Sequence, residues 1–410
     1  RNLVFDETYY PKDAWTMLQQ GYEGTWPDAA KANAGIVNGI TNAWTPDAEF
    51  VVHPPMGKWL IAIGEQLFGF NSFGWRFASV VFGSLLVLMT IRLARRLSRS
   101  TMVGAIAGIL LTLDGLAFVM SRVGLLDIFQ AFFLVAGVSA VAADRDWFRH
   151  HLADHLRAVG KPHLDGVFGP AQGWRPWRLV AGVMFGLACA TKWNSMFVLA
   201  TMGIISVIWD WSARRLAGAG TKAWWSFLRD GVPAFVYMVV VAVGSYIATW
   251  ARWLSVYPHM VLGKSWAGPN PDPGLSKVIG KPLAALWDYH QQMYDFHTGS
   301  YMMTQTHVYA SNPSGWLINQ RPLGIDAVND IKPGQQGCEA VGDTCLRVIS
   351  ATGTPVLWWF AAIALVAAVI WWIFARDWRF TLPIVAMMST WIPWFRYDNR
   401  PLFFFYAICI

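Results

Sequence analysis

The sequence carries little charge and few cysteines. Of its 410 residues, 14% are charged and four are Cys, whereas soluble domains have about 25% charged residues. This low charge indicates a chain that a bilayer solvates. Four cysteines are too few for a disulfide scaffold, and their spacing is not that of a zinc site. The net charge of +7 does not indicate nucleic-acid binding, because no basic stripe is interleaved with exposed aromatic residues.

Apolar and aromatic residues dominate instead. Hydrophobic residues make up 55% of the chain, and Trp, which suits membrane interfaces, occurs 25 times. A membrane-spanning helix needs roughly 20 mostly apolar residues. We therefore expect spans near 75–92, 101–120, 124–143, 178–192, 196–212, 231–251, 355–375 and 380–395. A ninth begins near Pro401, and because the chain starts at Arg1 and stops inside an apolar run, we expect further helices beyond both ends.

Positive charges predict how these spans are oriented. Four clusters follow alternate windows, at 92–99, 145–178, 214–229 and 376–379. Alternation puts them all on one side, which the positive-inside rule makes cytoplasmic. The chain then divides into four regions: a first extracytoplasmic loop with an interfacial helix (1–74), a transmembrane bundle (75–251), a long, partly helical extracytoplasmic loop covering a site (252–354) and C-terminal transmembrane helices (355–410).

The candidate functional residues lie on the predicted outer side. Asp6 and Glu7 are adjacent acids among aromatic residues, at a depth where desolvation raises a carboxyl pKa and makes a better base. A solvated turn would also explain such a pair. His53 and Lys58 flank two prolines and either orient an anionic group or only mark the rigid entry to an interfacial helix.

Further charges lie at the outer ends of apolar windows. Asp114, Arg122 and Asp127 are functional candidates because charge at the membrane boundary is costly; an ion pair between Arg122 and Asp127 is the structural alternative. Lys192, which precedes Trp193, either snorkels to lipid or joins Arg122 in binding a phosphate that enters from the bilayer.

The long loop supplies the remaining candidates. His297 and Arg321 belong to segments where polar and aromatic residues alternate, as in surfaces that bind sugars or peptides and also in ordinary interfacial loops. Cys338 and Cys345 are expected to form a disulfide if this loop is extracytoplasmic.

Together these segments resemble the protein O-mannosyltransferase family of GT-C membrane enzymes. The pieces occur in family order: Phe-Asp-Glu at 5–7, His-Pro-Pro at 53–55, Leu-Asp at 113–114, Ser-Arg-Val-Gly-Leu-Leu-Asp at 121–127, Lys-Trp at 192–193 and Phe-His-Thr-Gly at 296–299. Eukaryotic members insert a β-trefoil in the long outer loop. This loop has no room for one, so the chain resembles a bacterial, actinobacterial-type member.

The resemblance implies an all-α, polytopic fold with about 9 to 11 transmembrane helices. It also implies inverting transfer of mannose from polyprenyl phosphate mannose to Ser or Thr hydroxyls of secreted or membrane proteins. Asp6 would be the general base and Glu7 its support, with Arg122 and Lys192 offsetting charge on the leaving phosphate. Contacts to donor or acceptor are expected from His53, Lys58, Asp114, Asp127, Trp193, His297 and Arg321.

The expected partners are the donor lipid, membrane lipid and acceptor polypeptides, which are modified during Sec export in one version of this hypothesis. No nucleic acid is expected. We predict no required metal, because the adjacent acids have no further ligand at a diagnostic spacing; a divalent cation would be compatible but not required.

Two other functions fit the same residues less well. One is a GT-C transferase that moves another lipid-linked sugar to a lipid or glycan. The other is a transporter or flippase, which would place its charges near the bilayer midplane and often contain repeats. The predicted location is the cell membrane, with the active site on the extracytoplasmic face.

Overall fold

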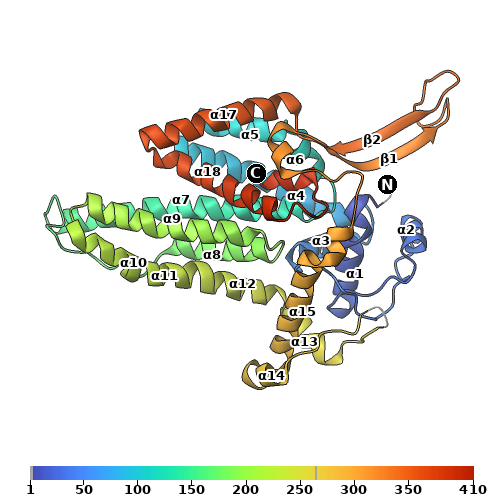
Figure 1. The fold of residues 1–410 in the computed structure, drawn as a ribbon, viewed down its shortest axis with the longest axis horizontal. Coiled ribbons are helices and arrows are strands. Elements are labelled where there is room, and N and C mark those ends of the chain that lie inside the picture. Colours follow the sequence, from blue (N-terminus) through green and yellow to red (C-terminus); the bar gives the residue numbers. More distant parts are fainter. Residues whose placement is uncertain (1–2, 264–265) are drawn as a thin grey trace.

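The computed structural model describes residues 3–263 and 266–410. A set of near-parallel helices forms one half of the molecule, and the first loop packs across one end of this bundle (Figure 1). That loop forms a short 3-10 helix and three α-helices: η1 (Phe5–Thr8), α1 (Tyr10–Gln20), α2 (Ala29–Val37) and α3 (Met56–Phe68). Gly21 ends α1 in the left-handed conformation, at φ 91°, which glycine adopts without steric cost.

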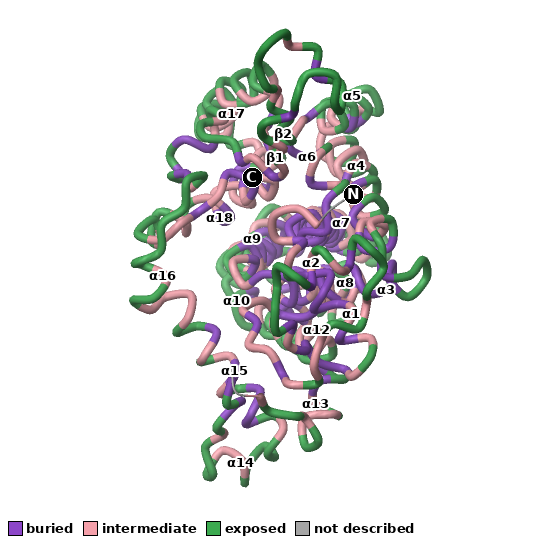
Figure 2. Tube along the Cα trace, turned by 90° about the vertical axis from the view of Figure 1, so that its right-hand side faces the viewer, coloured by how far each residue is buried: buried purple, intermediate pink, exposed green. Residues whose placement is uncertain are grey.

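The bundle is built around α7. Its most apolar window is 83% buried, and buried residues gather around it (Figure 2). The bundle helices are α4 (Gly74–Ser98), α5 (Thr101–Thr112), α6 (Gly115–Met120), α7 (Asp127–Ala158), α8 (Pro176–Cys189), α9 (Ser195–Leu216), α10 (Ser226–Arg229), α11 (Gly231–Phe235), α12 (Val241–Thr249), α17 (Pro355–Ala375) and α18 (Trp378–Trp391). Gly182 lets α8 and the π-helical segment Val236–Val240 approach closely, since a Cβ at Gly182 would lie 2.0 Å from the Tyr237 carbonyl oxygen.

The predicted apolar windows correspond to helices. Within the described residues, four helical stretches are long and apolar enough to cross a membrane: Gly74–Ser98, Asp127–Ala158, Ser195–Thr249 and Pro355–Ala375. The window at 101–120 is two helices, because Asp114 interrupts it and caps the second. The run after Pro401 differs from the prediction, since it forms a 3-10 helix, Phe404–Cys409, whose first two rings are buried.

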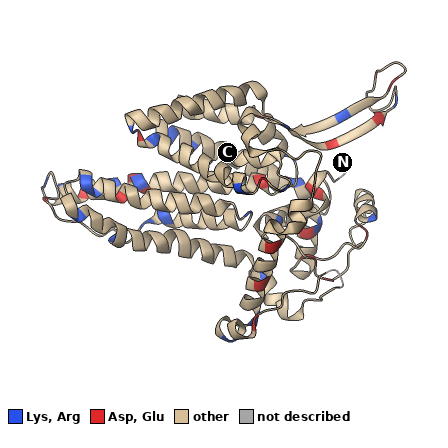
Figure 3. Cartoon of the chain, viewed as in Figure 1, with Lys and Arg blue, Asp and Glu red and all other residues tan. Residues whose placement is uncertain are grey.

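The four predicted arginine clusters gather at the end of the bundle remote from the first loop (Figure 3). Arg96 of the first cluster pairs with Asp146 at 2.8 Å. The guanidinium of Arg145 lies 3.3 Å from the ring centroid of Trp378, which belongs to the last. We call this the arginine-rich end and define it by Arg96, Arg145, Arg175, Arg178, Arg214 and Arg379. The opposite end, which carries the loops, is the loop end.

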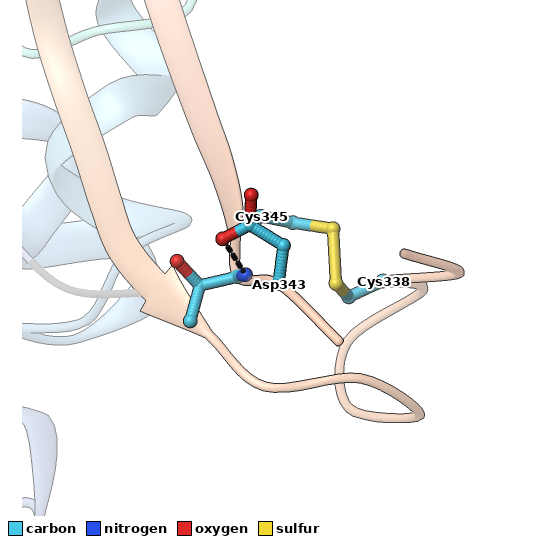
Figure 4. The surroundings of a disulfide bond; sticks show 4 residues. Cys338, Asp343 and Cys345 are labelled. Atoms are coloured by element: carbon cyan, nitrogen blue, oxygen red, sulfur yellow. Dashed lines mark hydrogen bonds between the residues drawn. A yellow bond between two sulfur atoms is a disulfide. The ribbon is translucent and has the colours of Figure 1, made fainter. Parts of the chain in front are cut away.

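The long loop is only partly helical, as predicted. It contains α13 (Ala251–Val256), α14 (Pro273–Ile279), α15 (Lys281–Thr298) and α16 (Ser300–Thr304). An antiparallel hairpin of β1 (Leu323–Ile331) and β2 (Cys345–Ala351) was not predicted, and it projects from the loop end (Figure 1). The predicted disulfide between Cys338 and Cys345 is confirmed, and it closes the loop between the strands (Figure 4).

Candidate active site

The acidic pair Asp6 and Glu7 lies on η1, at the loop end of the bundle. The ring of Phe5 anchors this short helix, since its centroid lies 5.6 Å from that of Phe403 and 5.8 Å from that of Phe405. Successive residues of a 3-10 helix point about 120° apart. The two carboxylates therefore face different surroundings.

Glu7 is fully buried and accepts four hydrogen bonds from residues that the structure describes. Its Oε1 accepts from Arg76 Nε at 2.7 Å and from the Gly124 backbone N–H at 2.8 Å. Its Oε2 accepts from Arg76 Nη2 at 2.5 Å and from the Val4 backbone N–H at 3.1 Å. Such a paired, charge-assisted arrangement is strong and fixes geometry. Glu7 thus holds Asp6 in place, and both of its oxygens are already engaged by donors of the described chain.

Asp6 is partly buried and has weaker partners. Burial raises its carboxyl pKa from 3.8 to about 6, an effect that the nearby Lys192 ammonium partly offsets and the Asp127 carboxylate increases. The Tyr10 hydroxyl donates to the Asp6 carboxylate. A carboxylate whose pKa is near neutral is a more effective general base than an ordinary one, so the desolvation expected from the sequence is present.

Lys192 and Asp127 form a buried ion pair beside Asp6. The Lys192 Nζ donates to both Asp127 carboxylate oxygens at 2.8 Å, and it lies 4.8 Å from the centroid of the Tyr406 ring. The structural alternative from the sequence paired Asp127 with Arg122. That pairing is wrong, because the cation on Asp127 comes from the turn between α8 and α9.

Arg122 lies apart from this pair. Its side chain is exposed, and its guanidinium carbon lies 3.4 Å from the centroid of the Phe118 ring. Within residues 3–263 and 266–410 it forms no ion pair. The two cations predicted to share a phosphate are therefore not side by side, and only Lys192 lines the cavity described next.

A largely apolar cavity of about 160 Å³ opens next to Lys192. Two cations and two imidazoles contribute to its wall, and most other lining residues are apolar or aromatic. The lining comprises Val52, His53, Lys192, Trp193, Asn194, Met196, Phe197, Tyr294, His297, Thr298, Pro393, Trp394, Tyr397, Arg400 and Tyr406. The cavity thus joins elements of the first loop, the α8–α9 turn, α15 and the turn after α18.

Arg400 is a cavity residue that the sequence reasoning did not single out. Its Nη1 donates to the His297 carbonyl oxygen and to His297 Nδ1, both at 3.1 Å. Its Nε is buried and has no hydrogen-bond partner in the described chain. The available signal was its position: like Lys192, Arg400 is a cation in an outer turn between two apolar windows.

The two histidines of the cavity are neutral at pH 7. Burial, with the nearby cations, lowers the pKa of His53 well below its usual 6.5. Burial also lowers the pKa of His297 to about 4, and its Nε2 lies 2.8 Å from the Val52 carbonyl oxygen. The ring centroids of the two histidines are 5.4 Å apart. Either ring can therefore contact a ligand by hydrogen bonding, but Lys192 and Arg400 supply the positive charge.

Trp193, next to Lys192 in the sequence, lines the cavity, and its expected contact with donor or acceptor stays a prediction. Its indole Nε1 donates to the Tyr246 hydroxyl at 3.0 Å, and its ring stacks on His290 of α15, with centroids 5.6 Å apart. These contacts fasten the long loop to the bundle next to the cavity.

Lys58 does not face the outer aqueous layer, and that prediction was wrong. Its side chain is 1% exposed and forms an ion pair with Glu23, with Asp13 3.9 Å away. Both prolines before it are buried, and α3 turns the lysine into the interior of the first loop. Lys58 therefore stabilises that loop and does not line the cavity.

Asp114 has a structural role, and the ligand contact expected from the sequence stays a prediction. One carboxylate oxygen caps α6 by accepting from the Ala117 N–H at 3.0 Å. The other accepts from the Thr354 N–H at 3.0 Å and from Trp358 Nε1 at 2.8 Å. Asp114 thus joins α6 to the start of α17.

Arg321 lines a separate, polar cavity. Its Nη2 donates to the Val308 carbonyl oxygen at 3.1 Å, and Arg400 is the residue common to the two cavities.

Metal binding has no support from the part of the chain that the structure describes, where no three His, Cys, Asp or Glu side chains form a candidate metal site. The independence from metal stays a prediction.

The sequence is similar to bacterial mannosyltransferases over nearly its whole length. It is 35% identical over 413 residues to the polyprenol-phosphate-mannose–protein mannosyltransferase of Mycobacterium tuberculosis, covering 98% of this chain and 72% of that one. Identity to the enzyme of the same name from Corynebacterium glutamicum is 34% over 414 residues, covering 99% and 74%. The family model for dolichyl-phosphate-mannose-protein mannosyltransferase matches residues 52–148.

The fold is similar to that of a eukaryotic relative. The Saccharomyces cerevisiae protein O-mannosyltransferase Pmt1-Pmt2 complex bound to the sugar donor aligns with a TM-score of 0.65 at 12% identity, covering all of this chain and 81% of that one. This likeness confirms the predicted GT-C fold. By its full-length similarity to the bacterial enzymes, the chain belongs to the polyprenol-phosphate-mannose–protein mannosyltransferase family and is a membrane glycosyltransferase.

Proposed function

We propose that the chain transfers mannose from polyprenyl phosphate mannose to Ser or Thr hydroxyls of polypeptides, with Asp6 as the general base. One observation carries this proposal: a carboxylate with a pKa of about 6 lies beside the buried Lys192–Asp127 pair, next to an apolar cavity with cations in its wall. This arrangement combines a base with a place for a lipid-linked phosphate.

The reaction is a single displacement at the anomeric carbon. Asp6 takes the proton of the acceptor hydroxyl as its oxygen attacks that carbon, and the bond from carbon to phosphate oxygen breaks. The bonding electrons leave with the polyprenyl phosphate. Attack from the side opposite the leaving group inverts the configuration. Glu7 keeps the base in position through Arg76, and its own oxygens are occupied.

The leaving phosphate gains negative charge, which Lys192 and Arg400 offset. Both line the apolar cavity, and the buried Nε of Arg400 is a donor without a partner in the described chain. Oriented charge in a poorly solvated site stabilises a developing anion more strongly than water does. Met196 and Phe197, at the start of α9, are exposed and offer apolar contact to the first prenyl units.

We propose that the loop end lies on the extracytoplasmic face of the cell membrane. The positive-inside rule assigns the arginine-rich end to the cytoplasm. The disulfide between Cys338 and Cys345 belongs to the loop end, and such bonds persist in oxidising compartments. Acceptors emerging from the Sec export machinery would reach this face unfolded, which would expose their hydroxyls.

The test is transfer of radiolabelled mannose from polyprenyl phosphate mannose to a Ser/Thr-rich peptide by membranes that contain the protein. We expect labelled peptide with the wild type and none with Asp6→Asn. Asp154→Asn, a change at an exposed carboxylate on α7, is the matched control and should transfer normally. Label that enters a lipid or glycan instead of the peptide would favour the other GT-C reaction, and label that crosses the bilayer unchanged would favour a flippase.

A further inference from the structure

A second cavity, of about 290 Å³, shares Arg400 with the apolar cavity and is lined mainly by polar groups. Ser311, Asn312, Gln320, Arg321 and Asp398 supply these groups, together with Arg400 itself. Arg400 lines both cavities, so a ligand in the polar one is adjacent to a ligand in the apolar one. None of the roles assigned above uses this polar cavity.

The side chains of the polar cavity suit a polypeptide main chain. The side-chain carbonyl oxygen of Asn312 accepts two hydrogen bonds from Ser314, one from its backbone N–H at 3.0 Å and one from its hydroxyl at 2.8 Å. The NH₂ group of Asn312 is left as a donor. In residues 3–263 and 266–410 the amide of Gln320 forms no side-chain hydrogen bond. An amide side chain both donates and accepts, so it matches the alternating N–H and C=O groups of an extended peptide.

The cavity is connected to the base through aromatic contacts. The wall segment that includes Ser311 follows His307, whose ring centroid lies 6.2 Å from that of Phe5 and 5.0 Å from that of Phe403. Phe5 immediately precedes Asp6 in η1. Arg321 holds the same segment by its hydrogen bond to the Val308 carbonyl oxygen. A ligand in the polar cavity would therefore lie against the structure that positions Asp6.

We propose that this polar cavity binds the main chain of the acceptor polypeptide next to the hydroxyl that receives mannose. The inference rests on the proposed function. Asn312, Gln320, Arg321 and Asp398 are all exposed, so the cavity is open to a water-borne chain. The donor sugar does not need this cavity, because it is bonded to the phosphate, which the cations of the apolar cavity hold. When Arg400 faces the donor phosphate, Arg321 and Asp398 balance each other in the polar cavity, which then suits uncharged segments rich in Ser and Thr.

The first test compares substrate dependence in the double variant Asn312→Ala/Gln320→Ala. We expect KM for a Ser/Thr-rich peptide to rise about tenfold, the loss expected for two neutral hydrogen bonds. KM for polyprenyl phosphate mannose, and the thermal stabilisation by polyprenyl phosphate, should stay at wild-type values. Gln335→Ala, at an exposed glutamine in the hairpin connection, is the matched control and should change neither constant.

Other outcomes overturn the proposal. A rise in donor KM with peptide KM unchanged would assign the cavity to the sugar, and no change in either would leave it without a part in substrate binding. Failure of the wild type to mannosylate any peptide would refute the proposed function, and it is seen before a variant is made.

A second test changes preference and does not depend on lost binding. Asp398→Arg should make the cavity more strongly positive, because it removes the carboxylate that balances Arg321 and adds a cation. The measured quantity is the ratio of two KM values, one for a peptide with Asp and Glu around the target Thr and one for a peptide with Lys there. We expect this acidic-to-basic ratio to be about tenfold lower in the variant than in the wild type. An unchanged ratio would show that Asp398 does not face the acceptor.

Discussion

The two ends of the bundle both hold buried charges, but they pair them differently. At the arginine-rich end, Arg175 and Arg178 share Asp144 and Asp210, with contacts from Arg175 to Asp144 at 2.6 Å and from Arg178 to Asp210 at 2.9 Å. Two cations balance two anions, and all four side chains are at most 3% exposed. This network ties α7, α8 and α9 together.

The loop end keeps its charges less completely paired. Asp6 has a hydrogen bond from Tyr10 and the electrostatic attraction of Lys192, which is itself committed to Asp127. Arg400 lies against a neutral histidine, and within the described residues it forms no ion pair with a carboxylate. Incompletely paired groups of this kind cost folding free energy unless a substrate completes them. The contrast teaches that the network of Arg175 and Arg178 uses charge for stability, whereas the charges around Asp6 and Arg400 are held ready for a ligand.

The largest expected effect is on transfer by Asp6→Asn. Loss of the general base should lower kcat by about 10² to 10⁴-fold. The melting temperature at pH 7 should stay the same or rise, because ionising a carboxylate with a raised pKa disfavours the folded state. Mannose transfer and thermal unfolding in detergent measure the two quantities. Normal transfer by the folded variant would remove Asp6 as the base and break the comparison.

Asp144→Asn should show the opposite behaviour at the arginine-rich end. Removing one partner of a buried ion network leaves a charge unpaired and costs about 3–5 kcal/mol. Less folded protein is expected, measured by thermal unfolding and by yield after extraction. The kcat of each folded molecule should remain near that of the wild type. A low kcat with unchanged stability would show that the two ends do not divide these roles.

Two variants test which arginine binds the donor phosphate. The structure indicates Arg400, whereas the sequence alone indicated Arg122, so we compare Arg400→Gln with Arg122→Gln. A charged hydrogen bond contributes about 1.5–3 kcal/mol, so Arg400→Gln should raise donor KM by at least about tenfold. Arg122→Gln should leave donor KM unchanged, because Arg122 lies outside the lining of the donor cavity. Steady-state kinetics with varied donor lipid measures both. The reverse result would restore the phosphate site predicted from the sequence.

The smallest expected effect is that of pH on the wild type. Asp6 must be ionised to accept a proton, and its pKa of about 6 lies above the ordinary 3.8. The value of kcat/KM should therefore fall about fivefold between pH 6 and pH 5, approach a tenfold fall per pH unit below that, and level off above pH 7. Since the folded state binds this proton more tightly, the contribution of Asp6 to stability is lost as the pH rises from about 4 through 6. A flat profile from pH 5 to 8 would contradict the assignment.

Much of the fold was predictable because bilayer constraints act on local sequence. Apolar windows located the helices, and the arginine clusters predicted that α4, α7, α9 and α17 end together. The hairpin was missed because its strands lie in a loop rich in Gly and Pro, where period-two alternation is weak. Asp6, His53, Lys192 and His297, all singled out from the sequence, lie in one region of the structure, and their roles stay predictions. Lys58 was misplaced because its buried partner, Glu23, is distant in sequence.

The sequence by itself determined the membrane-spanning helices, the shared side of their charged ends and the outer turns that carry the candidate groups. Only the tertiary structure decided which of those groups meet. It paired Lys192 with Asp127 across 65 positions, placed Arg400 against His297 across 103, and left Arg122 outside the cavity. Local spacing carries hydropathy and helix periodicity, whereas these contacts depend on how α7, α8, α15 and the final turn pack together.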